Sequence, residues 1–281
     1  MMIIIYNIRQ GQRRRVAMNN ASITPQRFSP RDIAMRFLTP DPRKQAAVSQ
    51  LGNWVESTRM ITTQAGQVHV SSAGQGPLVM FVHGWEGSIL DFEPLIMATL
   101  AQGFSVAAID LPAHGRSEGK RTSIPACAKA LLEIQAGLGQ DFYVVVAHSL
   151  GAGISGDALE RGLVAGKVVL ISPPRRFMDG IDMTAAQLGY DEMARQEMID
   201  TLREFGVDPV HVDLQKSATH LTIPALILHS DDDRVIPIIA AQSVAAAWAG
   251  SRFVPLTGLG HRRLLADAEV IREVVCFLGE A

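Results

Sequence analysis

From residue 78 onward, the 281-residue chain alternates between short strand-like segments and longer helix-like segments. The strand-like segments are apolar runs rich in β-branched residues, and the helix-like segments repeat apolar residues at helical spacing. The predicted strands are 78–82, 105–109, 142–146, 167–171, 225–229 and 252–255, and the predicted helices are 90–102, 124–138, 150–163, 238–248 and 264–278. This alternation predicts an α/β fold, with a mostly parallel sheet that carries helices on both faces.

The alternation is interrupted once, between residues 172 and 223. Helix-like segments follow one another there without a strand, and within 191–205 the apolar residues fall at helical spacing. Ligands of open α/β sheets bind beyond the carboxyl ends of the strands, and an insertion leaving that edge would cover the site. We therefore expect a helical cap at 173–222 and a core formed by 58–172 and 223–281.

The amino-terminal part departs from the same pattern. Residues 60–63 and 67–71 are strand-like and are separated by Ala65-Gly66, which predicts a β-hairpin at the start of the core. Residues 19–45 contain four prolines among polar residues and are expected to be irregular, with a short helix at 43–54. Residues 1–57 are thus predicted to be a partly irregular extension.

A candidate nucleophile lies where one buried strand is followed by a helix. The run V-V-V at 144–146 leads into A-H-S-L-G at 147–151. A strand, a sharp turn and a helix form the context in which a serine is exposed on a nucleophile elbow. Ala147 and Gly151 supply the small side chains that such a turn needs, so Ser149 is the candidate nucleophile.

Candidate partners for this serine follow in the order acid, then base. Acidic residues at 231–233 come directly after the strand 225–229, and His261 lies between the last predicted strand and the last helix. Serine acyl transfer needs a base, a group that orients the base and donors for an oxyanion. The backbone N–H groups of Trp85 and Leu150 are the candidate donors, and we interpret His83 and His148 as structural.

Five motifs in order resemble the α/β-hydrolase fold family over about residues 58–281. These are H-G-W at 83–85, D-L-P-A-H-G-R-S at 110–117, A-H-S-L-G at 147–151, Asp233 with V-I-P at 235–237, and Gly260-His261. The resemblance implies that Ser149 is the nucleophile, Asp233 the acid and His261 the base. It favours Asp233 over Asp232 because of the spacing to V-I-P, and it implies a structural turn for Asp110 and His114.

The implied activity is that of a serine hydrolase that cleaves a carboxylic ester of a small apolar substrate through an acyl-enzyme. Trp85, Met178 and Met183 are candidate substrate contacts, although methionines in a cap can also serve only to pack it. Thioesters, lactones, amides and the carbon–carbon bonds of diketones remain alternatives, as does a non-catalytic small-molecule-binding role. No cofactor and no metal are expected.

Composition limits the remaining possibilities. The net charge is −2, from 26 basic and 28 acidic residues, so the sequence gives no electrostatic indication of nucleic-acid binding. No apolar run reaches the roughly 18 residues of a membrane span. The apolar residues 1–6 precede the arginines at 13–15, which is the reverse of a secretory signal. The sequence has only two cysteines and shows no disulfide framework, which favours a reducing compartment. We therefore expect the protein to be cytoplasmic, and its partner to be a small-molecule substrate.

Overall fold

The fold was analysed in a computed structural model, which describes residues 28–41 and 52–280. Eight strands form one sheet in the order β1-β2-β4-β3-β5-β6-β7-β8. They are β1 (Ser57–Thr63), β2 (Gly66–Ala73), β3 (Leu78–Val82), β4 (Ser105–Ile109), β5 (Phe142–His148), β6 (Ala165–Ile171), β7 (Ala225–Ser230) and β8 (Ser251–Leu256). The hairpin of β1 and β2 is antiparallel and β2 joins β4 antiparallel, whereas all other neighbours are parallel. The predicted α/β fold is confirmed.

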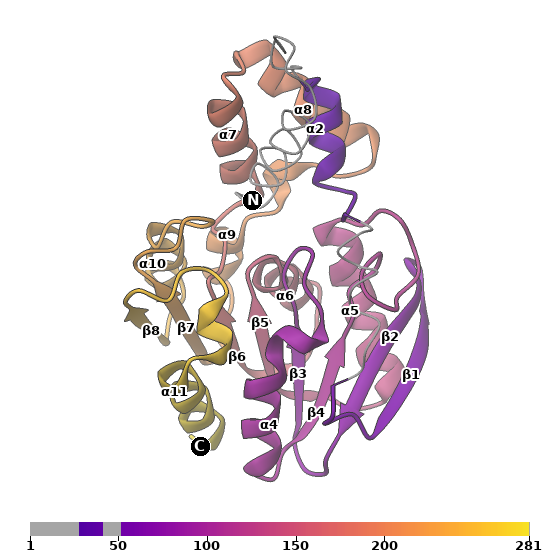
Figure 1. The fold of residues 1–281 in the computed structure, drawn as a ribbon, viewed down its shortest axis with the longest axis vertical. Helices are drawn as coiled ribbons and strands as arrows, with labels where there is room; N and C mark the ends of the chain where they lie inside the picture. Colours follow the sequence, from indigo (N-terminus) through magenta and orange to yellow (C-terminus); the bar gives the residue numbers. More distant parts are fainter. Residues whose placement is uncertain (1–27, 42–51, 281) are drawn as a thin grey trace, which may run out of the picture.

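Helices cover both faces of this sheet (Figure 1). The helical elements are α2 (Pro30–Arg36), η1 (Ile89–Phe92), α4 (Glu93–Ala101), α5 (Ile124–Leu138), α6 (Leu150–Glu160), α7 (Phe177–Leu188), α8 (Glu192–Glu204), η2 (Pro209–His211), α9 (Leu214–Ala218), α10 (Ile239–Ala247), η3 (Arg263–Ala266) and α11 (Ala268–Gly279). Strand side chains alternate between two apolar clusters: in β3, Met80 and Val82 join the cluster under α5 and α6, and Phe81 joins the cluster under α4 and α11.

The segment 173–222 contains α7, α8, η2 and α9, and α7 and α8 stand beyond the sheet in Figure 1. Capping residues mark the end of α7 and the start of α8. Gly189 ends α7 with φ of 68°, a left-handed conformation that glycine adopts readily. The Asp191 side chain then accepts a hydrogen bond from the backbone N–H of Ala194 and caps α8.

One prediction for the amino-terminal part is wrong. Within the segment expected to be irregular, residues 30–36 form helix α2, which packs against α8 (Figure 1). The Ser29 side chain accepts a hydrogen bond from Asp32 N, and Pro30 occupies the first turn, where no intrahelical donor is needed. Most of the helix expected at 43–54 lies outside the described residues, and residues 52–56 form a turn and an extended connection to β1.

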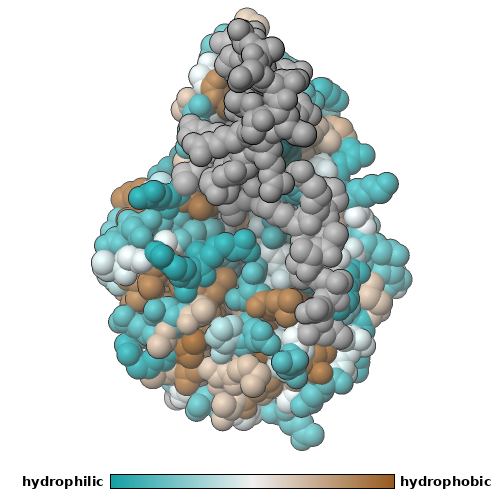
Figure 2. Space-filling model, in the orientation of Figure 1, coloured by the Kyte–Doolittle hydropathy of each residue, from teal (hydrophilic) through white to brown (hydrophobic). Residues whose placement is uncertain are grey.

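The surface of the described residues is mixed in polarity. On the face drawn in Figure 2, hydrophobic residues lie in small separate patches among hydrophilic ones. In the part of the chain that the structure describes, no helix combines the length and apolar character that a membrane crossing requires.

Candidate active site

Ser149 occupies the sharp turn between β5 and α6. Its φ of 54° and ψ of −121° lie outside the regions that non-glycine residues normally adopt, which is backbone strain of the kind found at functional sites. The turn is held in place because the backbone N–H of Ser149 donates to the carbonyl of Ile171 at 2.9 Å. The side chain is buried, with 8% of the residue exposed.

Two glycines allow the serine turn to approach the turn after β3 closely. A Cβ atom on Gly151 would lie 2.2 Å from the carbonyl oxygen of Val82, and one on Gly84 would lie 2.9 Å from Cβ of Ser149. Neither position tolerates a side chain without displacing backbone or the nucleophile. Ala147, which stands where a glycine is more usual, is fully buried within β5.

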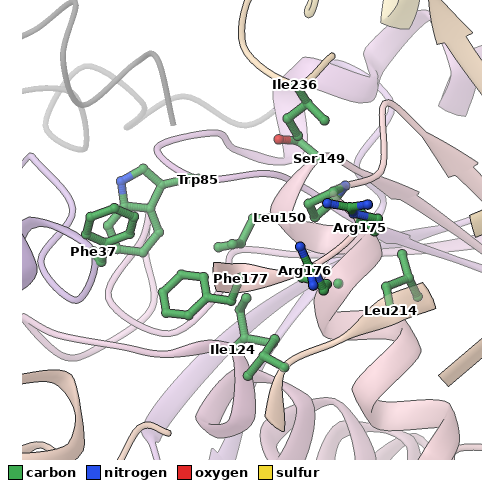
Figure 3. A pocket seen from close by; sticks show the side chains of 13 residues that line it. Phe37, Trp85, Ile124, Ser149, Leu150, Arg175, Arg176, Phe177, Leu214 and Ile236 are labelled. Atoms are coloured by element: carbon green, nitrogen blue, oxygen red, sulfur yellow. The ribbon is translucent and has the colours of Figure 1, made fainter. Parts of the chain in front are cut away.

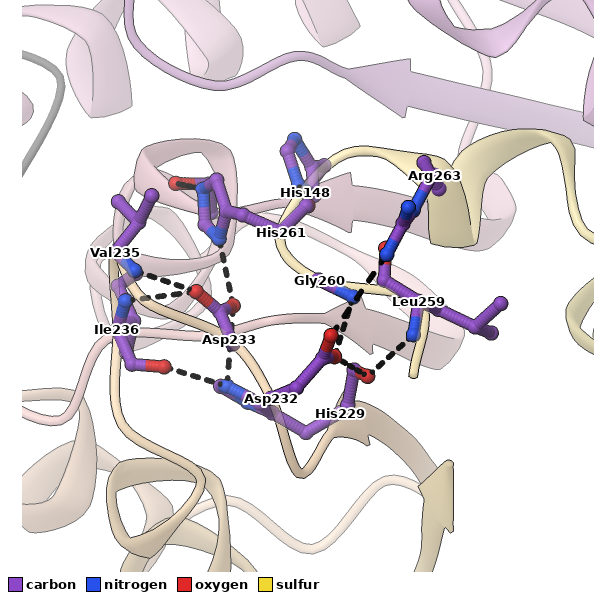
Figure 4. Close-up of polar contacts among 12 residues, drawn as sticks. His148, His229, Asp232, Asp233, Val235, Ile236, Leu259, Gly260, His261 and Arg263 are labelled. Atoms are coloured by element: carbon purple, nitrogen blue, oxygen red, sulfur yellow. Dashed lines mark hydrogen bonds and ion pairs between the residues drawn. The ribbon is translucent and has the colours of Figure 1, made fainter. Parts of the chain in front are cut away.

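The three residues predicted to act together lie in hydrogen-bond contact. His261 Nε2 is 2.9 Å from Ser149 Oγ, and His261 Nδ1 is 2.7 Å from Asp233 Oδ2. The acid follows β7 and the base precedes η3, so both reach the carboxyl edge of the sheet (Figure 4). With Nδ1–H donated to the carboxylate, the lone pair of Nε2 faces the serine hydroxyl, which is the arrangement a general base requires.

Asp233 is held as a carboxylate by several donors. Its Oδ1 accepts from the backbone N–H groups of Val235 and Ile236 at 2.7 and 3.0 Å (Figure 4). Burial raises the pKa of Asp233, but the hydrogen bonds from His229 and His261 outweigh it and hold the pKa well below its usual range. A charged acid therefore stands next to the imidazole at neutral pH.

His261 is a neutral base near pH 7. Burial lowers the pKa of His261 below its ordinary value of 6.5, and the Asp233 carboxylate opposes this shift without cancelling it. The backbone of the same residue is fixed from the serine side, since His148 Nε2 donates to the carbonyl of His261 at 2.8 Å. His148 thus has the structural role that the sequence suggested.

The turn after β3 carries the candidate oxyanion donors. Leu150 is the first residue of α6, where backbone N–H groups have no intrahelical acceptor, and Trp85 lies across from it in the turn. His83 braces this turn, because its Nε2 accepts from Leu111 N at 3.0 Å and its Nδ1 donates to the Gly84 carbonyl at 2.7 Å. Preorganised donors of this kind stabilise the charge of a tetrahedral intermediate.

Asp110 and His114 form the polar turn after β4 and do not contact the triad. His114 Nε2 accepts from the backbone N–H of Glu86 at 3.1 Å, and Asp110 Oδ2 lies 3.2 Å from His69 Nδ1. Burial lowers the pKa of His114 to about 3, so this imidazole is neutral in the folded protein. His114 thus supports the turn that carries Trp85, whereas Asp110 holds its own turn by accepting from Arg116 N at 3.2 Å.

An apolar pocket opens beside Ser149 (Figure 3). Its lining consists of Phe37, Trp85, Ile124, Ser149, Leu150, Gly153, Pro174, Arg175, Arg176, Phe177, Val212, Leu214 and Ile236. Met178 and Met183, the predicted substrate contacts in the cap, do not line it. In α7 it is Phe177 that faces the pocket, while Met178 packs against the neighbouring apolar cluster.

The two arginines of the lining are already partnered. Both guanidinium groups bond the carboxylate of Asp179, Arg175 through Nε at 2.8 Å and Arg176 through Nη2 at 2.6 Å. Residues 28–41 and 52–280 contain no group of three or more His, Cys, Asp or Glu side chains placed to hold a metal ion. The expectation of a cofactor-free site stays a prediction.

Two neighbours of the candidate site were not predicted from the sequence. His229, at the end of β7, places Nε2 3.3 Å from Asp233 Oδ2, and Phe37 reaches the pocket from the segment expected to be irregular. His229 could have been noticed as the only imidazole next to the acidic run. No sequence signal pointed to Phe37, because its contact depends on how a distant segment docks.

Comparisons with known proteins find relatives over most of the chain. The model of the alpha/beta hydrolase family matches residues 79–274. A pimeloyl-[acyl-carrier protein] methyl ester esterase of Xanthomonas campestris is 24% identical over 253 residues, 74% of this chain and 97% of that protein. A non-heme haloperoxidase of Rhodococcus erythropolis is 23% identical over 248 residues, covering 70% and 90%.

A comparison with solved structures finds the same fold in an esterase. The crystal structure of an esterase from Rhodococcus sp. superposes with a TM-score of 0.62 at 20% identity, covering 80% of this chain and 99% of the esterase. The family match spans most of the sheet, from β3 to α11, and includes all three residues of the serine, histidine and aspartate cluster. The chain belongs to the alpha/beta hydrolase family.

Proposed function

We propose that this hydrolase cleaves the carboxylic ester of a small apolar acyl group through a Ser149 acyl-enzyme. The observation that carries the proposal is the continuous contact from Asp233 through His261 to Ser149, with distances of 2.7 and 2.9 Å. An apolar pocket next to the serine supports an apolar acyl group, and the methyl ester esterase among the relatives supports an ester as the bond.

In the first step, Ser149 Oγ attacks the ester carbonyl carbon while its proton moves to His261 Nε2. The carbonyl oxygen becomes an oxyanion and accepts hydrogen bonds from the N–H groups of Trp85 and Leu150. Asp233 keeps the Nδ1–H tautomer and stabilises the imidazolium. When the intermediate collapses, the C–O bond to the alcohol breaks and His261 gives its proton to the leaving oxygen.

In the second step, water replaces the alcohol. His261 takes a proton from the water as its oxygen attacks the acyl carbon, and the same two N–H groups hold the new oxyanion. Collapse releases the carboxylic acid and returns the proton to Ser149 Oγ. Residues 173–222 act in this proposal as a cap that shields both steps from bulk water.

An alkyl fluorophosphonate and a panel of aryl esters test the proposal together. The wild-type protein should be labelled at Ser149 and should hydrolyse short apolar esters, whereas Ser149→Ala should do neither. Ser149→Ala and His261→Ala should each lose most of the activity, and the double variant should lose little more, because the two residues act as a unit. A wild-type protein that is neither labelled nor active would point to a binding role without turnover.

A further inference from the structure

Residues 28–41, here called the strap, reach the active site from outside the part of the chain that matches the family model. That match begins at residue 79, yet Phe37 of the strap lines the pocket beside Ser149. The strap contains α2 and continues past it toward the core (Figure 1). The contacts at its two ends hold it against the cap segment and against the core.

One end of the strap is anchored to the cap segment. Helix α2 packs along α8, and Arg31 Nη1 lies 2.7 Å from Glu204 Oε2. The Tyr190 hydroxyl, in the turn between α7 and α8, donates to the backbone carbonyl of Phe28. Ile33 of α2 is fully buried in this contact, so the attachment includes apolar packing and not only surface charges.

The other end is anchored to the core next to the candidate oxyanion donors. The backbone N–H of Thr122 donates to the carbonyl of Leu38 at 2.8 Å. The backbone N–H of Asp41 donates to Glu86 Oε1 at 3.1 Å, and Glu86 directly follows Trp85. The strap thus joins the cap segment to the turn after β3 and holds Phe37 between the two attachments.

Phe37 closes the pocket on the side away from the nucleophile. Its ring meets that of Phe177 edge to face, with centroids 5.6 Å apart, and only 5% of Phe37 is exposed. In Figure 3, Phe37 and Phe177 lie across the pocket from Ser149. An acyl chain that extended from the serine into the pocket would end against these two rings.

We propose that the strap sets the acyl-chain length of this enzyme, with Phe37 as the specificity-determining residue. The substrate class is then an ester of a short straight apolar acid, because the cavity is small, about 70 Å³, and the two rings close its far side. This proposal rests on the proposed hydrolase function for its substrate, but the shape of the pocket can be tested separately.

Two substitutions of Phe37 should move the chain-length preference in opposite directions. With p-nitrophenyl esters from acetate to dodecanoate, Phe37→Ala should raise the ratio of kcat/KM for octanoate to that for butanoate at least tenfold, since each methylene in an apolar pocket contributes about 10-fold or more. Phe37→Trp should lower the same ratio. Phe205→Ala is the matched control, because Phe205 is a half-exposed ring on the cap outside the pocket lining, and it should leave the ratio unchanged.

Binding of n-alkanoates to Ser149→Ala, measured by calorimetry, separates the two proposals. Butanoate to hexanoate should bind better than decanoate, and adding Phe37→Ala should reverse that order whether or not the protein hydrolyses esters. Chain-length profiles that are identical with Phe, Ala and Trp at position 37, in hydrolysis or in binding, would overturn the role of the strap. A shifted binding profile in a protein that hydrolyses no ester would uphold the strap and overturn the hydrolase proposal.

Discussion

Adjacent carboxylates after β7 have different tasks. Asp233 faces His261, whereas Asp232 Oδ1 accepts from the backbone N–H of Gly260 and from the Ser230 hydroxyl, both at 2.6 Å (Figure 4). Asp232 therefore holds the loop that carries the base, and Asp233 contacts the base itself. Substitutions of Asp232 and Asp233 can therefore be compared with each other, because both residues lie in the same turn.

Asp233→Asn should lower kcat about 10⁴-fold, because an amide at this position favours the wrong tautomer of the histidine. Asp232→Asn should lower it less than about tenfold, since an amide oxygen can still accept both hydrogen bonds of Asp232. Steady-state kinetics on a short ester, with circular dichroism to check folding, would measure both. Equal losses in the two variants would contradict the assignment of the acid.

The acid limb of the pH profile should report His261. The base acts only when neutral, and burial lowers its pKa in spite of Asp233. The value of kcat/KM should therefore decline as the pH falls, with a midpoint below the ordinary histidine value of 6.5. A stopped assay from pH 4.5 to 8 would locate the midpoint, and one above 6.5 would be inconsistent with this environment.

The sequence predicted the contact of Ser149, His261 and Asp233 because each residue follows a strand, where local pattern and chain order suffice. It did not predict His229, whose Nε2 also lies 2.9 Å from the carbonyl of Ile236. That contact exists only because residues 230–236 fold back over the end of β7. The path of this loop depends on its three-dimensional structure, and the hydrophobic periodicity of the sequence does not predict it.

At the level of elements, the junction of β5 and α6 packs closely against the turn after β3. Gly151→Ala should abolish most activity and lower the melting temperature, because its Cβ would lie 2.2 Å from the Val82 carbonyl and would push the elbow away from the turn after β3. Gly279→Ala near the end of α11 is the control, since a Cβ there meets nothing within 4 Å. Differential scanning calorimetry and ester kinetics would compare the two. A fully active Gly151→Ala protein would disprove the close approach.

The regular elements of the core were predictable to the residue in several cases. The predicted bounds of β3, β4 and α5 coincide with those observed, because each is a continuous apolar run or a capped amphipathic helix. Helix α2 was missed because its proline was interpreted as a breaker, although proline is also favoured in a first turn. Met178 and Met183 were assigned to the pocket by composition, whereas the orientation of α7 is decided by packing.

At the scale of the whole molecule, four histidines among the described residues are buried with a lowered pKa. Burial lowers the pKa of His83, His114, His148 and His261 below the ordinary value of 6.5. In the unfolded chain each imidazole takes up a proton as the pH falls through 6.5, whereas in the folded protein it does so only at lower pH. The contribution of these four groups to folding stability is therefore present in full above pH 6.5 and is lost progressively as the pH falls below it.

His114 alone, with a folded pKa of about 3, should lower the free energy of unfolding by about 1.4 kcal/mol per pH unit below 6.5. His114→Gln removes this proton while an amide oxygen can still accept from Glu86 N. Urea unfolding at pH 7, 6 and 5 should show a shallower pH dependence for this variant than for the wild-type protein. The same slope in both would mean that His114 is protonated in the native state.

The strap has a consequence for the order in which a newly made chain can become active. Its residues leave the ribosome before any strand of the sheet, but their partners at 122, 190 and 204 are translated roughly 80 to 170 residues later. The first described helix must therefore wait unpaired while the scaffold grows. His261 emerges later still, so under the proposed function a nascent fragment cannot hydrolyse an ester until synthesis is nearly complete.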